Sequence, residues 1–264
     1  MKDLKYETLA LEQPAEHLLI VRFNRPGVRN AISTQVGRDM LDLFSRFQAP
    51  TDIRCIVLTG TGDKAFCAGG DLKERHGMTD AQWLAQHAIF ERMTLAVLDC
   101  PIPVIAAVNG AAFGGGCELA LTCDFVYAST AARFALTEIT LGIMPGGGGT
   151  QFLPRAVGAR RAKEIILTGK PFSAQDALEW GMVNKLCAPE KLMEETLATA
   201  QTICDNAPIS VRQAKRSIHF GAHMDVRSAL FFEVDAYNKM VGTQDRLEGV
   251  KAFNEKRKPD FKGR

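Results

Sequence analysis

Short apolar and β-branched runs, separated by glycine, proline and polar clusters, predict the strands of this chain. Residues 6–10 and 18–23 have this character, and the second run ends at the turn-forming cluster Asn24-Arg25-Pro26-Gly27. Residues 53–58 and 104–108 are almost entirely apolar. Such runs are typical of strands that are buried on both faces of a sheet.

Helices are predicted where apolar residues recur every three or four positions. Ser33 can cap a helix of this kind. Its apolar stripe consists of Val36, Met40, Leu43, Phe44 and Phe47. A longer helix is expected from about residue 80 to 98, where Pro101 and Pro103 end it. Residues 117–121 follow a run of three glycines and predict another helix.

The second half of the chain contains fewer strands and more helix. Residues 125–128 and 133–136 predict two short strands, and residues 181–183 predict a last one. Most of the sequence after Ser173 has helical character. Strands that alternate with helices indicate an α/β core. Spacing alone leaves open whether residues 189–264 dock on this core or extend to a neighbouring subunit.

Composition excludes several classes of protein. The 264 residues carry 32 Lys and Arg against 30 Asp and Glu, so the net charge of +2 provides no global basic field for nucleic acid. No apolar run reaches membrane-spanning length, and the N-terminal residues lack the apolar segment of a secretory signal. Seven cysteines without C-x-x-C spacing argue against a disulfide framework and favour a reducing, cytoplasmic compartment.

Two histidines have the spacing of metal ligands but lack the rest of a site. His219 and His223 are four residues apart, yet Gly221 lies between them and no third ligand is evident. We therefore interpret them as residues on a helix surface, and we expect no metal ion.

Three glycine-rich loops lie near the ends of predicted strands, at residues 60–71, 114–116 and 144–151. Glycine lets a ligand approach the main chain closely, and free N–H groups at a helix start favour negative charge. Two such donors can form an oxyanion hole, although glycine clusters also serve as tight turns. The phosphate-binding motifs G-x-G-x-x-G and G-x-x-x-x-G-K-[ST] do not occur, nor does G-x-S-x-G.

Two glutamates lie in mostly apolar surroundings. Glu118 follows the second glycine loop, and Glu138 precedes the third. Two carboxyls that share one desolvated site titrate at separated pKa values, which prepares one to hold a proton and the other to accept one. Structural explanations exist for both, because acidic residues are favoured in the first turn of a helix and Glu138 could pair with Arg133 or Arg155.

Several of these segments, in this order, resemble the enoyl-CoA hydratase/isomerase (crotonase) superfamily over nearly the whole chain. The matching segments are NRP at 24–26, NA at 30–31, FCAGGDL at 66–72, PVIAAVNG at 103–110, GGGCELALTCD at 114–124, FALTEITLGIMPGGGGTQ at 134–151, LTG at 167–169 and AFNEKRKPDFKG at 252–263. The resemblance implies an α/β fold with a spiral of ββα repeats and a helical C-terminal trimerisation region. We accordingly expect a core with the active site at residues 1–190 and a helical region at 191–264. Trimers of this kind often pair into hexamers.

The resemblance also implies a thioester of coenzyme A as the substrate and no other cofactor. The two N–H groups of its oxyanion hole correspond to Gly70, where many hydratases have alanine, and Gly115. Contacts with coenzyme A and the acyl group are expected from Val28, Ala68, Asp71, Leu72 and Gly146. The tail of an adjacent subunit is expected to reach the nucleotide through Phe253 and Lys256.

Within this superfamily, hydratases carry two glutamates, which match Glu118 and Glu138. The implied reaction is syn addition of water across the 2,3-double bond of an enoyl-CoA, which gives a 3-hydroxyacyl-CoA. We expect Glu118 to activate the water and Glu138 to donate a proton to the α carbon. The alternative is isomerisation or another acyl-CoA reaction of the superfamily, for example hydration of 3-methylglutaconyl-CoA. A homologue that binds RNA is a third, less favoured alternative. The pocket wall is expected from residues 76–98 and from helices near Phe231 and Phe232.

Some segments resemble the branch that contains 3-methylglutaconyl-CoA hydratases and AU-rich RNA-binding homologues. These segments are LKER at 72–75, GGGGTQ with LPRA at 146–156 and DRLEG at 245–249. The RNA binders carry a lysine-rich early helix, whereas residues 33–48 here offer only Arg38 and Arg46 beside two aspartates. We therefore expect neither nucleic acid nor membrane as a partner.

Overall fold

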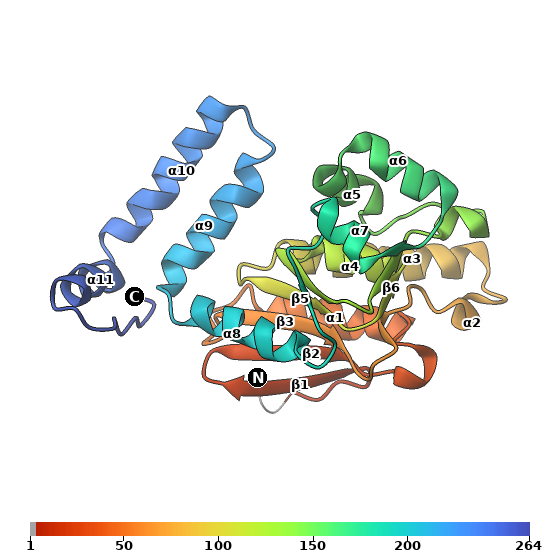
Figure 1. Cartoon of the computed structure of the whole chain (residues 1–264), viewed down its shortest axis with the longest axis horizontal. Helices are drawn as coiled ribbons and strands as arrows, with labels where there is room; N and C mark the ends of the chain where they lie inside the picture. Colours follow the sequence, from red (N-terminus) through yellow and green to blue (C-terminus); the bar gives the residue numbers. More distant parts are fainter. Residues whose placement is uncertain (1–3) are drawn as a thin grey trace.

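Two β-sheets form the centre of the chain in the computed structural model, which describes residues 4–264 (Figure 1). The larger sheet has the strand order β1 (Leu9–Ala15), β2 (Leu18–Phe23), β3 (Cys55–Gly60), β5 (Val104–Val108), β7 (Phe125–Ser129) and β10 (Lys185–Cys187). The smaller sheet has the order β4 (Ala65–Cys67), β6 (Ala111–Phe113), β8 (Arg133–Ala135) and β9 (Phe172–Ser173). Among the strands of residues 4–264, β1 with β2 and β8 with β9 pair antiparallel, and the other pairs are parallel.

From β3 to β8, successive strands alternate between the two sheets, and this confirms the expected spiral of ββα repeats. The pairs β3–β4, β5–β6 and β7–β8 each place their first strand in the larger sheet and their second in the smaller one. A helical segment follows each pair. These segments are α2 (Leu72–Arg75) and α3 (Asp80–Leu98), then α4 (Gly115–Thr122), then the 3-10 helix η2 (Glu138–Leu141) with α5 (Gly149–Val157) and α6 (Ala159–Thr168).

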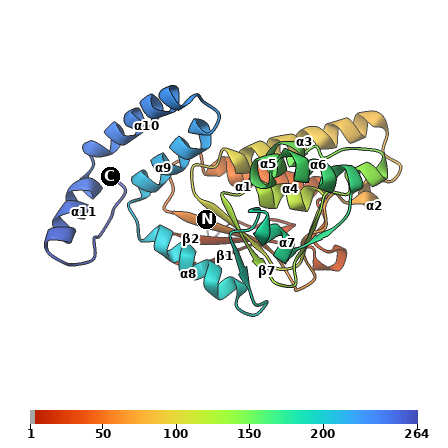
Figure 2. The same cartoon turned by 45° about the horizontal axis from the view of Figure 1, so that its top comes forward.

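The central strands β2, β3 and β5 are buried on both faces, and their alternate residues point to different layers. In β2, Leu19 and Val21 belong to the main core, whereas Leu18 and Ile20 pack in a second cluster that includes Leu192 of α8 (Leu192–Cys204). Helix α8 lies along the outer face of this sheet (Figure 2). The nearly continuous apolar character of these strands follows from this double burial.

The first helix forms as its sequence predicts. Helix α1 (Thr34–Arg46) begins after Ser33, whose hydroxyl accepts a hydrogen bond from the N–H of Val36 at 3.3 Å. All five residues of the predicted stripe are buried in the main core. Helix α3 begins with a capping box between Thr79 and Gln82 and has the predicted bounds.

Three predicted strand positions require correction. The first strand starts at Leu9 rather than at residue 6, and the strand predicted at 53–58 occupies Cys55–Gly60. Residues 181–183 are not a strand, because the N–H groups of Met182 and Val183 donate to the carbonyl of Ala177 in α7 (Ala174–Glu179). They close the end of that helix, and the last strand is β10.

The end of the chain leaves the core as a helical arm (Figures 1 and 2). This arm consists of α9 (Pro208–Gly221), α10 (Val226–Val241) and α11 (Gln244–Asn254). Because α8 packs on the larger sheet, the arm begins after Cys204, at the end of α8. The expected division of the chain into a core of residues 1–190 and a helical region of residues 191–264 stays a prediction. Within residues 4–264, no helix is long and apolar enough to cross a membrane.

Candidate active site

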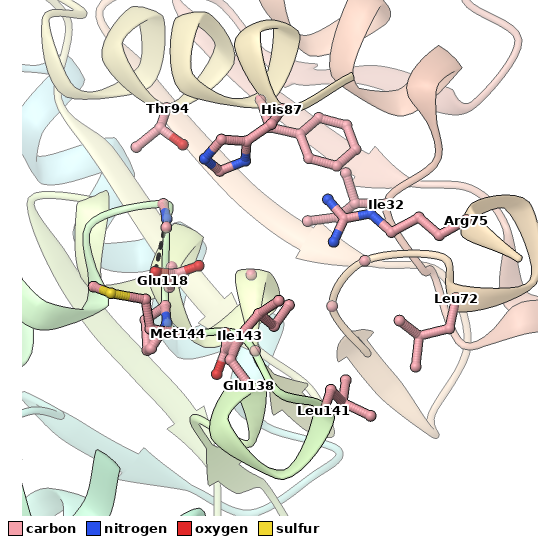
Figure 3. Close-up of a pocket in the computed structure, with 18 of the residues that line it drawn as sticks. Ile32, Leu72, Arg75, His87, Thr94, Glu118, Glu138, Leu141, Ile143 and Met144 are labelled. Atoms are coloured by element: carbon pink, nitrogen blue, oxygen red, sulfur yellow. Dashed lines mark hydrogen bonds between the residues drawn. The ribbon is translucent and has the colours of Figure 1, made fainter. Parts of the chain in front are cut away.

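A cavity of about 550 Å³ opens between α3 and the loops that follow β4, β6 and β8 (Figure 3). Apolar side chains make up most of its wall, among them Ile32, Phe90, Met93, Ile143 and Met144. The predicted residues that line it are Ala68, Gly70, Leu72, Gly115, Glu118, Glu138 and Gly146. The structure therefore brings together residues from four separate segments of the chain.

Two backbone N–H groups are available at one side of this cavity. In the bridge beside Gly70, the N–H of Ile32 donates to Gly69 at 2.8 Å and the N–H of Asp71 donates to Ile32 at 2.9 Å. This pattern leaves the N–H of Gly70 outside the ladder. Gly115 is the first residue of α4, so its N–H has no partner within the helix. Their loops touch, since a Cβ on Gly69 would lie 3.5 Å from the nitrogen of Gly115.

Glu118 lies in the first turn of α4 and is held by the third glycine loop. Its Oε1 accepts hydrogen bonds from the N–H groups of Gly147 and Gly149, both at 2.8 Å. Burial raises the pKa of Glu118 above its usual value, while the two amides and nearby His87 oppose this effect. Oε2 makes neither of these bonds, and it is the oxygen that can act on a ligand.

Glu138 is the first residue of η2 and has no such support. Among residues 4–264, neither of its buried carboxyl oxygens has a hydrogen-bond partner. The structural alternative of a pair with Arg133 or Arg155 is therefore wrong; Arg155 donates instead to the carbonyl of Gln151. Burial raises the pKa of Glu138 to about 7, and the negative charge of Glu118 acts in the same direction.

Glu118 and Glu138 both line the cavity (Figure 3), and each lies beside a glycine at the start of α4. A Cβ on Gly114 would lie 3.2 Å from Oε1 of Glu138, and one on Gly115 would lie 3.9 Å from Oε2 of Glu118. Two carboxyls with different hydrogen-bond support thus lie beside a pair of N–H donors. This arrangement suits proton transfer to and from a substrate whose carbonyl oxygen gains charge.

Two residues expected to contact coenzyme A, Asp71 and Val28, do not line this cavity. The Asp71 carboxylate pairs with Arg25 at 3.0 Å and accepts hydrogen bonds from the N–H groups of Lys73 and Glu74 at the start of α2. It therefore fixes the loop rather than the cavity wall. Val28 lies in the 3-10 helix η1 (Pro26–Val28), is 36% exposed, and does not line the cavity.

Residues of the arm do not reach the cavity of their own chain. Phe253 on α11 is 84% exposed, and Lys256 follows that helix. Phe231 and Phe232 lie on α10 and are also absent from the cavity wall. A contact of these residues with substrate would require a second copy of the chain.

The expected wall at residues 76–98 is present, but its individual members were not predicted. Helix α3 contributes Trp83, Leu84, His87, Phe90, Met93 and Thr94, and α2 contributes Arg75. Helix α3 has apolar residues on more than one side, because one side packs on α1 and another lines the cavity. A periodic stripe that would distinguish the cavity side is therefore missing from the sequence.

Comparison with known proteins agrees with this architecture. Residues 14–264 match the family model described as enoyl-CoA hydratase/isomerase. YngF of Bacillus subtilis is 46% identical over 249 residues, which cover 94% of this chain and 95% of YngF. The short-chain-enoyl-CoA hydratase of Clostridium acetobutylicum is 39% identical over 93% of this chain and 94% of its own.

Among solved structures, the enoyl-CoA hydratase from Bacillus anthracis superposes with a TM-score of 0.96. It is 41% identical, and the match covers 98% of this chain and all of that one. Sequence, fold and cavity thus lead to the same assignment. The chain belongs to the enoyl-CoA hydratase/isomerase family.

Proposed function

We propose that this protein is an enoyl-CoA hydratase, a hydro-lyase that adds water across the 2,3-double bond of an enoyl-CoA thioester. The product is a 3-hydroxyacyl-CoA. The relatives from Clostridium acetobutylicum and Bacillus anthracis carry the name of this activity. The observation that carries the proposal is the pair of differently held carboxyls, Glu118 and Glu138, beside the two unused amides.

The amides of Gly70 and Gly115 hold the thioester oxygen in this proposal. When water adds to C3, the electrons of the double bond move toward the carbonyl, and the oxygen becomes enolate-like. Preorganised N–H donors stabilise this charge more strongly than the ground-state carbonyl, and the loss of one such donor typically costs ~3–4 kcal/mol. Because both donors belong to the main chain, glycine in place of alanine at position 70 retains the function.

Glu118 is the base and Glu138 the acid. The amides of Gly147 and Gly149 favour the ionised form of Glu118, whose Oε2 accepts a proton as the water oxygen bonds to C3. Glu138, with a pKa of about 7, holds a proton and gives it to C2, which neutralises the enolate. In this proposal both carboxyls act on the same face of the substrate, so H and OH add from the same side.

The remaining expected contacts complete this proposal. Ala68, Leu72 and Gly146 line the cavity and would contact the acyl-CoA. We propose that no further cofactor takes part, since proton transfer and oxyanion stabilisation supply the chemistry. We also propose a homotrimer in which Phe253 and Lys256 of one subunit reach the coenzyme A bound to its neighbour.

Hydration of crotonyl-CoA tests the proposal directly, through the loss of the absorbance of the conjugated thioester. We expect E118Q and E138Q each to lower kcat by about 10²- to 10⁴-fold, and the double variant to be inactive. E164Q, which alters an exposed carboxyl on α6 outside the cavity, should retain full activity. Full activity of the double variant would refute the assignment. Products formed in labelled water separate hydration, which incorporates solvent oxygen, from isomerisation, which does not.

A further inference from the structure

A guanidinium group lies in the wall of the active-site cavity. Arg75, labelled in Figure 3, ends α2. Its Cζ lies 4.2 Å from the ring centroid of Trp83 and 5.5 Å from that of Phe90. The two aromatic rings hold the planar group by cation–π contacts and remove part of its hydration. Burial accordingly lowers the pKa of Arg75 from its usual value, although arginine stays charged at neutral pH.

This cation forms no ion pair with any residue that the structure describes, although the charge of Glu74 acts on it from a longer distance. Throughout residues 4–264, no carboxylate oxygen lies within 4.0 Å of its nitrogens. The carboxylate of the adjacent Glu74 is directed elsewhere, because its Oε2 accepts hydrogen bonds from the N–H of Thr34 at 2.8 Å and from Nε2 of Gln86 at 3.1 Å. A half-buried charge without a partner is unfavourable unless a ligand compensates for it.

Gln86 determines which part of the guanidinium remains free. Its Nε2 donates to Glu74 and to Oγ1 of Thr34, and these bonds fix the orientation of the buried amide. Oε1 therefore faces Arg75 and accepts the hydrogen bond from Nε at 2.7 Å. The Nη1 and Nη2 groups, which form the two-pronged end of the side chain, are left for another acceptor.

The free end lies next to the proposed site of the thioester. A Cβ on Gly70 would lie 3.6 Å from both Cζ and Nη1 of Arg75. If the amide of Gly70 holds the thioester oxygen, this guanidinium is within reach of the acyl chain. The phosphates of coenzyme A lie the whole length of the pantetheine arm away from the thioester, so they are poor candidates for this partner.

We propose that Arg75 is a specificity-determining residue that selects enoyl-CoA substrates with a second carboxylate on the acyl chain, a few carbons beyond the thioester. This inference rests on the proposed hydratase function. Nη1 and Nη2 each donate a hydrogen bond to one oxygen of this carboxylate. The hydrogen bond of Nε with Gln86 orients the guanidinium, and Trp83 and Phe90 exclude water from the ion pair.

The test compares two substrates that differ only at the distal end of the acyl chain, glutaconyl-CoA with a carboxylate and trans-2-pentenoyl-CoA with a methyl group. We expect the wild type to have the higher kcat/KM for glutaconyl-CoA. R75M should lower this value by about 30-fold or more, as the loss of one partner from a desolvated charge pair does, and should change the value for pentenoyl-CoA by less than about threefold. R75K keeps the charge without the fork and should recover only part of the preference.

A matched control is available on another helix. Arg161 on α6 also stacks on a tryptophan, with its Cζ 4.4 Å from the ring centroid of Trp180, but it does not line the cavity. R161M should leave the ratio of the two kcat/KM values unchanged. If R75M lowered kcat/KM equally for both substrates, Arg75 would act on the thioester oxygen or maintain the loop structure, and the specificity role would be wrong. A wild-type preference for pentenoyl-CoA would also overturn the proposal.

A binding measurement separates this inference from the proposed reaction. Glutaryl-CoA and pentanoyl-CoA are saturated and cannot be hydrated. The first ends in a carboxylate and the second in a methyl group. Calorimetry should show tighter binding of glutaryl-CoA to the wild type and loss of that preference in R75M. If neither enoyl substrate is hydrated but this binding preference holds, the hydratase proposal fails while the role of Arg75 stands. Equal Kd values for the two ligands would overturn the role of Arg75.

Discussion

Two chemically identical side chains acquire different roles through the groups around them. Glu118 accepts two main-chain hydrogen bonds, which favour its charged form, whereas the buried oxygens of Glu138 have no partner within residues 4–264. Burial opposes the charge of both, but only Glu138 lacks compensation from amides of another loop. This difference in hydrogen bonding is the basis for the proposed roles of Glu118 as base and Glu138 as acid.

The activity should depend on pH in a way that follows from this difference. Because Glu138 must be protonated to act as the acid, kcat/KM should decrease as the pH rises through about 7, the pKa of Glu138 in the free protein. At lower pH the rate should fall as Glu118 becomes protonated. Stopped-flow or absorbance assays with crotonyl-CoA over this range give the profile. A value of kcat/KM that stays constant well above neutrality would contradict the assignment of Glu138 as the acid.

Protein stability gives an independent measurement of the same pKa. The pKa of Glu138 is 4.5 in its reference state and about 7 in the folded protein, so the folded state binds more protons between these values. The favourable contribution of the protonated group is complete below the lower value and is lost as the pH rises through the higher one. E138Q removes this dependence. We expect its free energy of unfolding, relative to the wild type, to rise by about 2 kcal/mol between acidic and alkaline pH, after allowance for solvent near the site.

The position of helix α4 depends on a close approach to strand β4. A Cβ on Gly116 would lie 2.1 Å from the carbonyl oxygen of Cys67 and 2.8 Å from its Cβ. No side chain fits there without displacing the start of the helix, which carries Gly115 and Glu118. The proposed oxyanion amide and the proposed base therefore depend on the same close packing.

G116A tests this requirement. We expect it to lower the free energy of unfolding by roughly 2–3 kcal/mol, since overpacking forces backbone shifts, and to lower kcat by displacing the Gly115 amide. Chemical denaturation and the crotonyl-CoA assay provide the two measurements. G27A is the matched control for stability, because nothing lies within 4 Å of a Cβ at that position. Similar stability of the two variants would show that α4 tolerates displacement.

Strong local patterns predicted some elements well. The bounds of β2, β5 and α3 agree with the prediction, because double burial or proline boundaries mark them in the sequence. Strand β6 was missed, since its three residues Ala111–Phe113 form a strand only through pairing with β4 and β8. Such pairing joins distant segments and leaves little local signal.

The candidate site was predictable to the extent that glycine loops and motifs mark it. Gly70, Gly115, Glu118 and Glu138 lie together as expected. Arg75 was not identified, because its significance depends on a missing counter-ion and on the orientation of a glutamine from another helix. These are properties of the folded cavity, and neither spacing nor composition encodes them visibly.

At the scale of the whole molecule, the arm exposes an apolar surface that the single chain leaves uncovered. Leu230, Val234, Tyr237 and Val241 recur along one side of α10, and each is about half exposed or more. A helix stripe of this kind is normally buried against another element. The proposed homotrimer supplies that element, and it also brings the Phe253 and Lys256 of one subunit toward the cavity of the next.

L230E combined with V234E should therefore convert a trimer into monomers, because two carboxylates in an apolar interface would lose their hydration without gaining partners. Light scattering coupled to gel filtration measures the mass. E233Q, which alters an exposed residue outside this stripe, should remain trimeric. The monomer should also bind crotonyl-CoA roughly tenfold more weakly, since the tail contacts of the neighbouring subunit are lost. A monomeric wild type, or a double variant that remains trimeric, would contradict the proposed assembly, and unchanged substrate affinity in the monomer would place Phe253 and Lys256 outside the binding site.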